Sequence, residues 1–212
     1  MSESGSNAKL VSDCARMAHA FKTLIDVYTE VAANTNPAAA LPMLAWATAD
    51  GAAAAARLAA IKDVDPPAGD LEEPPFFDLD PLRSGLANVL GENDVYNELE
   101  DSRAEDALVG QESITESILT AVSAFRVGLY YYETAGPTAA MWYWQYSAMT
   151  MWADRIASAL RQVLLLLSAA HRQGHAQLVH ALKELRRTLE VTAAVTGEIS
   201  VVNLSEALPP RS

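Results

Sequence analysis

The residue types best suited to hold a ligand gather in one short stretch of the chain. Three of the four tryptophans lie within eleven residues, at Trp142, Trp144 and Trp152, and a run of three tyrosines, 130–132, precedes them. Aromatic faces that enclose a few polar groups are typical of small-molecule pockets. We predict a candidate pocket from this stretch and one arginine upstream of it: Trp142, Gln145, Tyr146, Trp152, Asp154, Arg155 and Arg126.

Core packing is the simpler explanation of the same stretch. Its aromatic residues fall on both faces of a helix, which is typical of the buried centre of a helical bundle. A charge inside such a helix is costly unless it is paired. We therefore expect Asp154 to form an ion pair with Arg126 on the preceding helix.

The negative charge of the chain is concentrated in one segment. The formal net charge is -12, and residues 63–106 hold fourteen acids against two bases, whereas the rest of the chain has thirteen of each. Direct contact of this segment with nucleic acid or with an anionic membrane is disfavoured, because both are negatively charged and would be repelled by it. A basic protein partner is the electrostatic match, although many runs of like charge only keep a protein soluble.

Three functions are compatible with these features. The first is a non-enzymatic protein that binds another protein through an acidic surface, for which the candidate residues are Asp94, Tyr96, Glu98, Glu100 and Asp101. The second is a small-molecule or nucleotide-binding enzyme with its site beside the Trp-rich helix. The third is an acidic mimic of nucleic acid that binds a basic protein. The sequence leaves open whether the chain is a monomer or a homodimer.

The usual signatures of metal binding and catalysis are missing from the sequence. His171 and His175 have the spacing of two ligands on one helix face, but Gly174 lies between them and Arg172 would repel a cation. Cys14, the single cysteine, falls among apolar helix positions and is expected to be a core thiol. We predict no catalytic residue, no metal site and no cofactor.

Apolar spacing predicts the helices that position these residues. A seam repeats every three or four residues through Leu10, Cys14, Met17, Phe21, Leu24, Tyr28 and Val31. A second helix is expected from Pro42 to about Ile61, forming an antiparallel hairpin with the first. Residues 63–81 then form a long acidic connector, because five prolines interrupt them. Phe76, Phe77 and Leu79 are expected to pin this connector to the body.

Further helices follow the connector. A short helix is expected over residues 82–90, and the pair Ser113 and Glu116 predicts a capping box before a helix that ends at Gly136. Two more are expected over 138–171 and 175–195, separated at Gly174. No strand is convincing; the best candidate, Ile199 to Leu204, is short.

The fold class predicted from this pattern is all-α, a helical bundle of about five to six helices. We expect one bundle domain over residues 1–197, with the acidic connector inside it, and a loosely held tail over 198–212. The start of the chain lacks a signal peptide, and there is one cysteine, so a cytoplasmic location is expected. The uncharged stretch 134–153 is more typical of a buried helix than of a membrane span.

Four short motifs resemble those of one protein family. They are Asp94-Val95-Tyr96-Asn97-Glu98, Gly128-Leu129-Tyr130-Tyr131-Tyr132, Trp142-Tyr143-Trp144-Gln145-Tyr146-Ser147 and Ala159-Leu160-Arg161. With them the chain is similar to the bacterial domain-of-unknown-function 5063 family, particularly its actinobacterial members. The resemblance implies a small helical cytoplasmic protein with no established activity. It carries over no catalytic residue.

Overall fold

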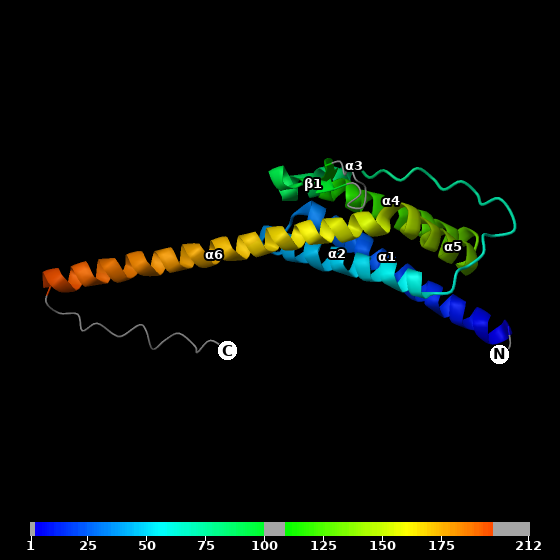
Figure 1. Ribbon diagram of the computed structural model, residues 1–212, viewed down its shortest axis with the longest axis horizontal. Helices are drawn as coiled ribbons and strands as arrows, with labels where there is room; N and C mark the ends of the chain where they lie inside the picture. Colours follow the sequence, from blue (N-terminus) through cyan, green and yellow to red (C-terminus); the bar gives the residue numbers. More distant parts are fainter. Residues whose placement is uncertain (1–2, 100–108, 197–212) are drawn as a thin grey trace. The chain divides into compact units, whose positions relative to one another are not determined.

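The computed structural model describes residues 3–99 and 109–196. Within them the chain is helical apart from one small sheet, so the predicted all-α bundle is confirmed. The elements are α1 (Glu3–Ala33), α2 (Pro37–Ala60), α3 (Asp80–Leu90), the 3-10 turn η1 (Gly91–Asn93), β1 (Val95–Leu99), β2 (Val109–Ser113), α4 (Ile114–Thr134), α5 (Pro137–Ser147), the π-helical turn η2 (Ala148–Trp152) and α6 (Ala153–Thr196) (Figure 1).

Internal contacts divide the chain into two compact units. The first, residues 1–167, contains every element up to the first part of α6, and the second, residues 168–212, contains the rest of that helix. The predicted tail, 198–212, lies outside the described residues. The hydrophobic core and the candidate site described below belong to the first unit.

Helix α1 contributes the seam that its apolar spacing predicts. Six of the seven seam residues are buried, and Leu10 packs against the core at its edge. The helix contacts α2, α3, α4 and α5, so its long apolar face is covered by several neighbours. The predicted pairing of the first two helices is confirmed, since α1 and α2 pack together across a short turn at residues 34–36.

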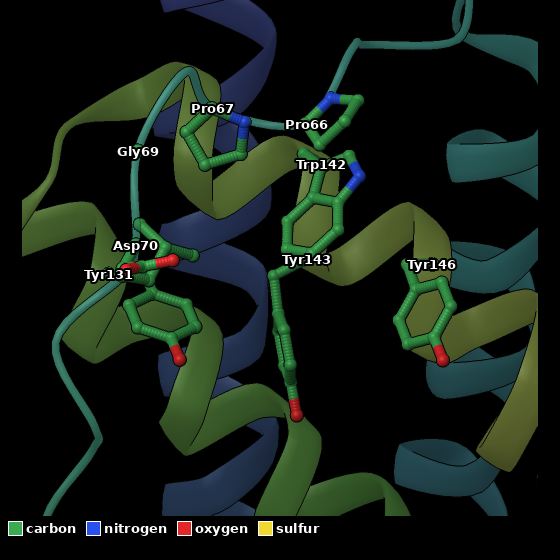
Figure 2. Close-up of a pocket in the computed structure, with 9 residues that line it drawn as sticks. Pro66, Pro67, Gly69, Asp70, Tyr131, Trp142, Tyr143 and Tyr146 are labelled. Atoms are coloured by element: carbon green, nitrogen blue, oxygen red, sulfur yellow. The ribbon is translucent and has the colours of Figure 1, made fainter.

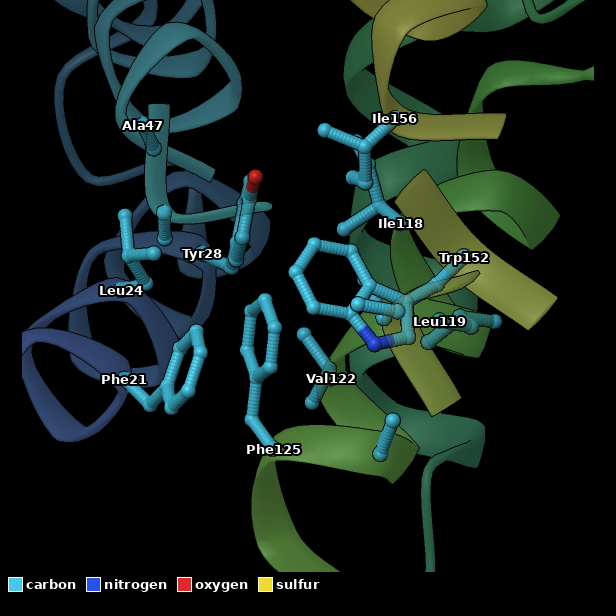
Figure 3. Close-up of a cluster of buried hydrophobic side chains, with 14 of the residues drawn as sticks. Phe21, Leu24, Tyr28, Ala47, Ile118, Leu119, Val122, Phe125, Trp152 and Ile156 are labelled. Atoms are coloured by element: carbon cyan, nitrogen blue, oxygen red, sulfur yellow. The ribbon is translucent and has the colours of Figure 1, made fainter. Parts of the chain in front are cut away.

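Aromatic rings of α1, α4, α5 and η2 pack together at the centre of the core (Figure 3). Phe21 of α1 stacks on Phe125 of α4 with ring centroids 4.2 Å apart. Trp144 of α5 lies 5.0 Å from Phe21, and Trp152 of η2 meets Phe125 edge-on at 5.1 Å. Offset and edge-on pairs of this kind add to the free energy gained from burial alone. The core therefore ties the Trp-rich segment to the first helix.

Gly128 allows α4 and α5 to approach closely. A Cβ atom at this position would lie 1.8 Å from Nε1 of Trp144, far inside van der Waals contact. The indole therefore packs directly on the backbone of α4. This close pairing fixes α5, and with it the side chains on its outer face.

Two helix boundaries differ from those predicted. Helix α2 begins at Pro37, and Pro42 lies inside it. Either proline satisfied the sequence signal for a first turn, so the signal was ambiguous. Helix α6 continues through Gly174 without a break, because a single glycine costs only about 1 kcal/mol among strong helix formers. The interruption occurs instead at η2, where no proline or glycine marks it.

The expectation of no strand is wrong. Strands β1 and β2 pair antiparallel, from Val95 opposite Ser113 to Leu99 opposite Val109. The strands are short and polar, with Asn97 and Glu98 facing Gln111 and Gly110, so they lack the alternation that marks a half-buried strand. The first acidic motif, Asp94 to Glu98, is thus mostly a strand. We call β1 and β2 the hairpin.

The acidic connector, predicted over residues 63–81, occupies residues 61–79, because Pro81 lies in the first turn of α3; it follows an extended path between α2 and α3, with no helix or strand (Figure 1). Phe77 and Leu79 are partly buried, as predicted, but the Phe76 side chain is 92% exposed, which contradicts its predicted role as an anchor. Among the described residues, no helix has the length and apolar character that crossing a membrane would require.

Candidate binding pocket

A pocket of about 320 Å³ lies where the acidic connector passes over α4 and α5. Figure 2 shows the connector above it, with Pro66 and Pro67 near the Trp142 indole and Asp70 near Tyr131. Its lining comes from the connector, α4 and α5: Pro66, Pro67, Gly69, Asp70, Leu71, Tyr131, Trp142, Tyr143 and Tyr146. Its volume is at the low end of the range of about 300–1,000 Å³ that ligand pockets occupy.

Four of the lining side chains are aromatic. Trp142 and Tyr146 stack with centroids 5.7 Å apart and planes inclined by 10°. Tyr131 and Tyr143 meet edge-on at 5.4 Å. The three tyrosine hydroxyls point to the same side, away from the prolines (Figure 2). Tyr146 is 54% exposed, so aromatic surface remains open to solvent.

The position of these side chains follows from the two faces of α5. Trp144 and Met141 are fully buried on the face toward α1 and α4. Trp142 and Tyr146, one turn apart, lie on another face and are only partly covered. The expectation of a helix buried all round is therefore wrong: the chain uses one aromatic face for the core and leaves the other for the connector.

Gln145 anchors the start of the connector beside the pocket. Its amide nitrogen donates to the backbone carbonyls of Leu58, Ile61 and Lys62 at 3.2 to 3.4 Å, and its oxygen accepts from the backbone N–H of Val64 at 3.0 Å. Carbonyls at the end of a helix lack partners within the helix. The side chain predicted to line a pocket thus instead satisfies the end of α2 and fixes the path of the connector.

The charge around the pocket is negative. Asp70 lies in the lining, and the lining contains no lysine, arginine or histidine. The connector carries six exposed carboxylates, and no ion pair within the described residues engages them: Asp63, Asp65, Asp70, Glu72, Glu73 and Asp78. Burial raises the pKa of Tyr131, and the nearby charge of Glu73 raises it further. Burial likewise raises the pKa of Tyr143, so both hydroxyls are neutral at pH 7.

The remaining predicted pocket residues lie elsewhere. Trp152 is buried in the core, and its Nε1 donates to the Ser147 hydroxyl at 3.2 Å. Arg155 pairs with Glu112 at 3.6 Å. The predicted ion pair between Asp154 and Arg126 is wrong, because Asp154 is exposed and needs no compensating charge.

Arg126 instead contacts the far end of the connector. Its guanidinium carbon lies 5.9 Å from the centroid of the Phe77 ring, and its Nη1 is 3.5 Å from the Asp78 carbonyl oxygen. A guanidinium at this distance is attracted by the face of an aromatic ring. Arg126 therefore secures the connector next to α3, as Gln145 does next to α2.

Two acids of the predicted interaction surface, Asp94 and Glu98, bind groups of neighbouring helices. Asp94 accepts the backbone N–H of Thr115 at 2.8 Å and the Ser113 hydroxyl at 2.9 Å, which caps α4. Ser113 accepts from the Glu116 N–H, the first half of the predicted capping box. The second half is replaced, because the Glu116 carboxylate pairs with Arg83 at 2.8 Å.

Glu98 joins the hairpin to α6. Its carboxylate accepts from the Ser158 hydroxyl and lies 3.4 Å from Nη2 of Arg161. Tyr96 is partly buried on the same strand; burial raises its pKa, and the charge of Glu98 acts in the same direction. Glu100 and Asp101 lie outside the described residues.

Cys14 and the histidines are not part of the pocket lining. The Cys14 thiol donates to the Pro137 carbonyl at 3.2 Å, and burial raises its pKa to about 12, which keeps it protonated. His171 and His175 are exposed on α6. Among the described residues, no group of three histidine, cysteine or acidic side chains is placed to hold a metal ion.

Sequence reasoning missed more than half of the pocket lining. Trp142 and Tyr146 were included, but Tyr131, Tyr143 and the connector residues were not. Two signals were available, namely the run of three tyrosines and the prolines of the connector. Neither indicated that the two segments meet, because that contact depends on the path of an irregular segment.

Fold and site together define a helical bundle whose Trp-rich helix is crossed by a proline-rich acidic connector. The chain belongs to the family described as a domain of unknown function (DUF5063), whose model matches residues 6–169. The matched region contains the whole pocket and the hairpin, and it ends close to residue 167, where the first unit ends. None of the curated proteins matches the chain. Nor does any solved structure.

Proposed function

We propose that the chain is a non-enzymatic binding protein that takes up a basic segment of a partner protein. The observation that carries this proposal is the composition of the pocket: four aromatic side chains and one carboxylate, with no cationic side chain, beneath a connector of exposed acids. Aromatic faces and carboxylates both attract cations. The pocket thus combines the two groups that hold a positively charged ligand.

Charge argues against a nucleotide in this pocket. Phosphate groups are held by arginine, lysine or the N–H groups of a helix N-terminus. The lining offers no basic side chain, and the acids of the connector would repel a phosphate. A cationic segment meets no such barrier.

The connector is a better binding surface than the hairpin. The carboxylates of Asp94 and Glu98 already accept hydrogen bonds from residues at the start of α4 and in α6. The connector acids remain exposed, and one of them, Asp70, lines the pocket. A partner that approached the acids of residues 63–73 would gain electrostatic attraction, and the hydrogen bond that Asp78 accepts from the Asp80 N–H would stay intact.

A second candidate is a receptor for a small organic cation. The observation that favours it is the size of the pocket, about 320 Å³, which suits a free ligand as well as a side chain. Such a ligand would bind without the exposed acids at the ends of the connector. The two candidates therefore differ in whether connector acids outside the pocket contribute to binding.

The test is a titration of the full chain with a short peptide in which lysines and arginines alternate with serines. Two triple variants change the net charge equally, one on the connector and one at exposed acids outside it: D65N/E72Q/E73Q and D26N/E30Q/D154N. We expect the connector variant to bind about tenfold more weakly and the control variant to bind like the original chain. Equal binding by the two variants would overturn the proposal.

A further inference from the structure

The pocket presents aromatic faces rather than only aromatic edges. Trp142 and Tyr146 stack with nearly parallel planes, and Tyr146 is about half exposed. A cation is attracted when it lies over such a face within about 6 Å of the ring centroid. The stacked pair therefore offers a surface on which a flat cation can lie.

Oxygen acceptors belong to the same lining as these faces. The carboxylate of Asp70 is in the lining, on the connector side, near Tyr131 (Figure 2). Because the hydroxyls of Tyr131 and Tyr143 are neutral at pH 7, they can accept hydrogen bonds from a cation. No basic side chain in the lining competes for these acceptors.

Among the cations of proteins, the guanidinium group fits this arrangement best. It is planar, stacks on aromatic faces and donates two parallel hydrogen bonds to a carboxylate. The ammonium group of lysine is strongly hydrated and has no planar face. An aromatic face beside a carboxylate is therefore better matched to arginine than to lysine.

The connector already holds one arginine of the chain in this way. Arg126 lies over the Phe77 ring at 5.9 Å and reaches the Asp78 carbonyl oxygen at 3.5 Å. An aromatic ring and an oxygen from the same connector thus bind a guanidinium at one point. The pocket repeats this combination at a second point, with larger aromatic faces and a full negative charge.

We propose that the pocket receives the guanidinium group of an arginine from the basic partner segment, stacked on Trp142 and Tyr146 and hydrogen-bonded to Asp70. This inference rests on the proposed function and names the side chain that its site recognises. Lysine then contributes only through the general attraction of the connector acids.

The test compares three peptides that differ at one central residue, which is arginine, lysine or the neutral arginine analogue citrulline. They are titrated into the full chain and into the variants Y146L and D70N. Both altered side chains are exposed, so the core is untouched. The control is W46L, which removes a half-exposed aromatic side chain on α2, outside the pocket lining.

We expect the arginine peptide to bind about three- to tenfold more tightly than the other two. Y146L and D70N should abolish this preference, and W46L should keep it. Equal binding of the arginine and lysine peptides, both weakened by the connector variant, would overturn the inference and leave the proposed function standing.

A small free probe tests whether the arginine site exists even if the proposed partner segment is wrong. N-acetylarginine amide carries the guanidinium group without a basic segment, and its binding is followed by tryptophan fluorescence. If it binds the chain but not Y146L while all peptides fail to bind, the arginine site stands and the proposed partner is wrong. If neither it nor the arginine peptide binds, the arginine site is wrong as well.

Discussion

The acidic connector and the hairpin carry the same kind of charge and use it in opposite ways. In the hairpin region, Asp94 caps α4, Glu98 contacts Ser158 and Arg161, and Glu112 pairs with Arg155. In the connector, six carboxylates are exposed and have no ion pair within the described residues. A segment's charge alone thus does not indicate whether its acids are available to a partner.

The difference arises from the donors within reach of each segment. The hairpin leads into the N-terminus of α4, whose first N–H groups lack partners inside the helix, and it packs beside basic residues of α6. The connector contains four prolines and follows an extended path, so its acids meet mainly solvent. Its fixed points come mainly from Gln145 and Arg126, and one of its carboxylates, that of Asp78, accepts the backbone N–H of Asp80 at 3.0 Å where α3 begins.

The largest expected effect is on the free energy of unfolding, which should depend on an acid of the hairpin region but not on an acid of the connector. Replacing Asp94 with alanine removes the acceptor of the Thr115 N–H in the first turn of α4 and the acceptor of the Ser113 hydroxyl, so we expect the free energy of unfolding to fall by about 1–2 kcal/mol. Replacing Asp70 with alanine should change it by less than about 0.5 kcal/mol, because that side chain is exposed. Urea denaturation followed by tryptophan fluorescence measures both, and equal losses would contradict the comparison.

A smaller effect is expected at the anchor of the connector. Replacing Gln145 with alanine removes the acceptor of the Val64 N–H, a hydrogen bond worth about 1 kcal/mol. The Val64 amide should then exchange its hydrogen about fivefold faster under native conditions. The matched control is Q111A, an exposed glutamine on β2 whose loss should leave Val64 unchanged. Unaltered exchange in Q145A would show that the connector is fixed by other contacts.

The smallest expected effect uses one tyrosine in each region as a reporter. A negative charge disfavours tyrosinate, so Glu73 raises the pKa of Tyr131, and Glu98 raises that of Tyr96. We expect E73Q to lower the pKa of Tyr131 without affecting Tyr96, and E98Q to do the reverse. NMR titration of ring-labelled tyrosine measures both values. If each variant moved both tyrosines alike, the two acidic regions would not be electrostatically separate.

Much of the fold could be predicted because it depends on short-range signals. The seam of α1 follows from apolar spacing, and the start of α4 at Ile114 from Ser113 and Glu116. Predictions failed where the competing energies were similar or the signal was absent. Pro37 and Pro42 compete for one helix start, Gly174 is tolerated inside a helix, and the π-helical turn has no marker in the sequence.

The candidate site was predictable only in part. Trp142 and Tyr146 could be named because their residue types and helical spacing are distinctive. Tyr131 joins them because α4 packs against α5, and Asp70 and Pro66 join them only because the connector is held at its two ends by Gln145 and Arg126. The path of an irregular segment is set by a few long-range contacts, and no local pattern encodes those contacts.

The sequence by itself determined that this chain is a helical bundle with its net charge confined to one segment, because apolar periodicity and composition are local properties. Only the tertiary structure decided which acids remain exposed and which aromatic rings form a pocket. Both depend on what lies opposite a side chain in space. A carboxylate beside a helix terminus acts as a cap, whereas a carboxylate exposed on an extended connector is a candidate binding group.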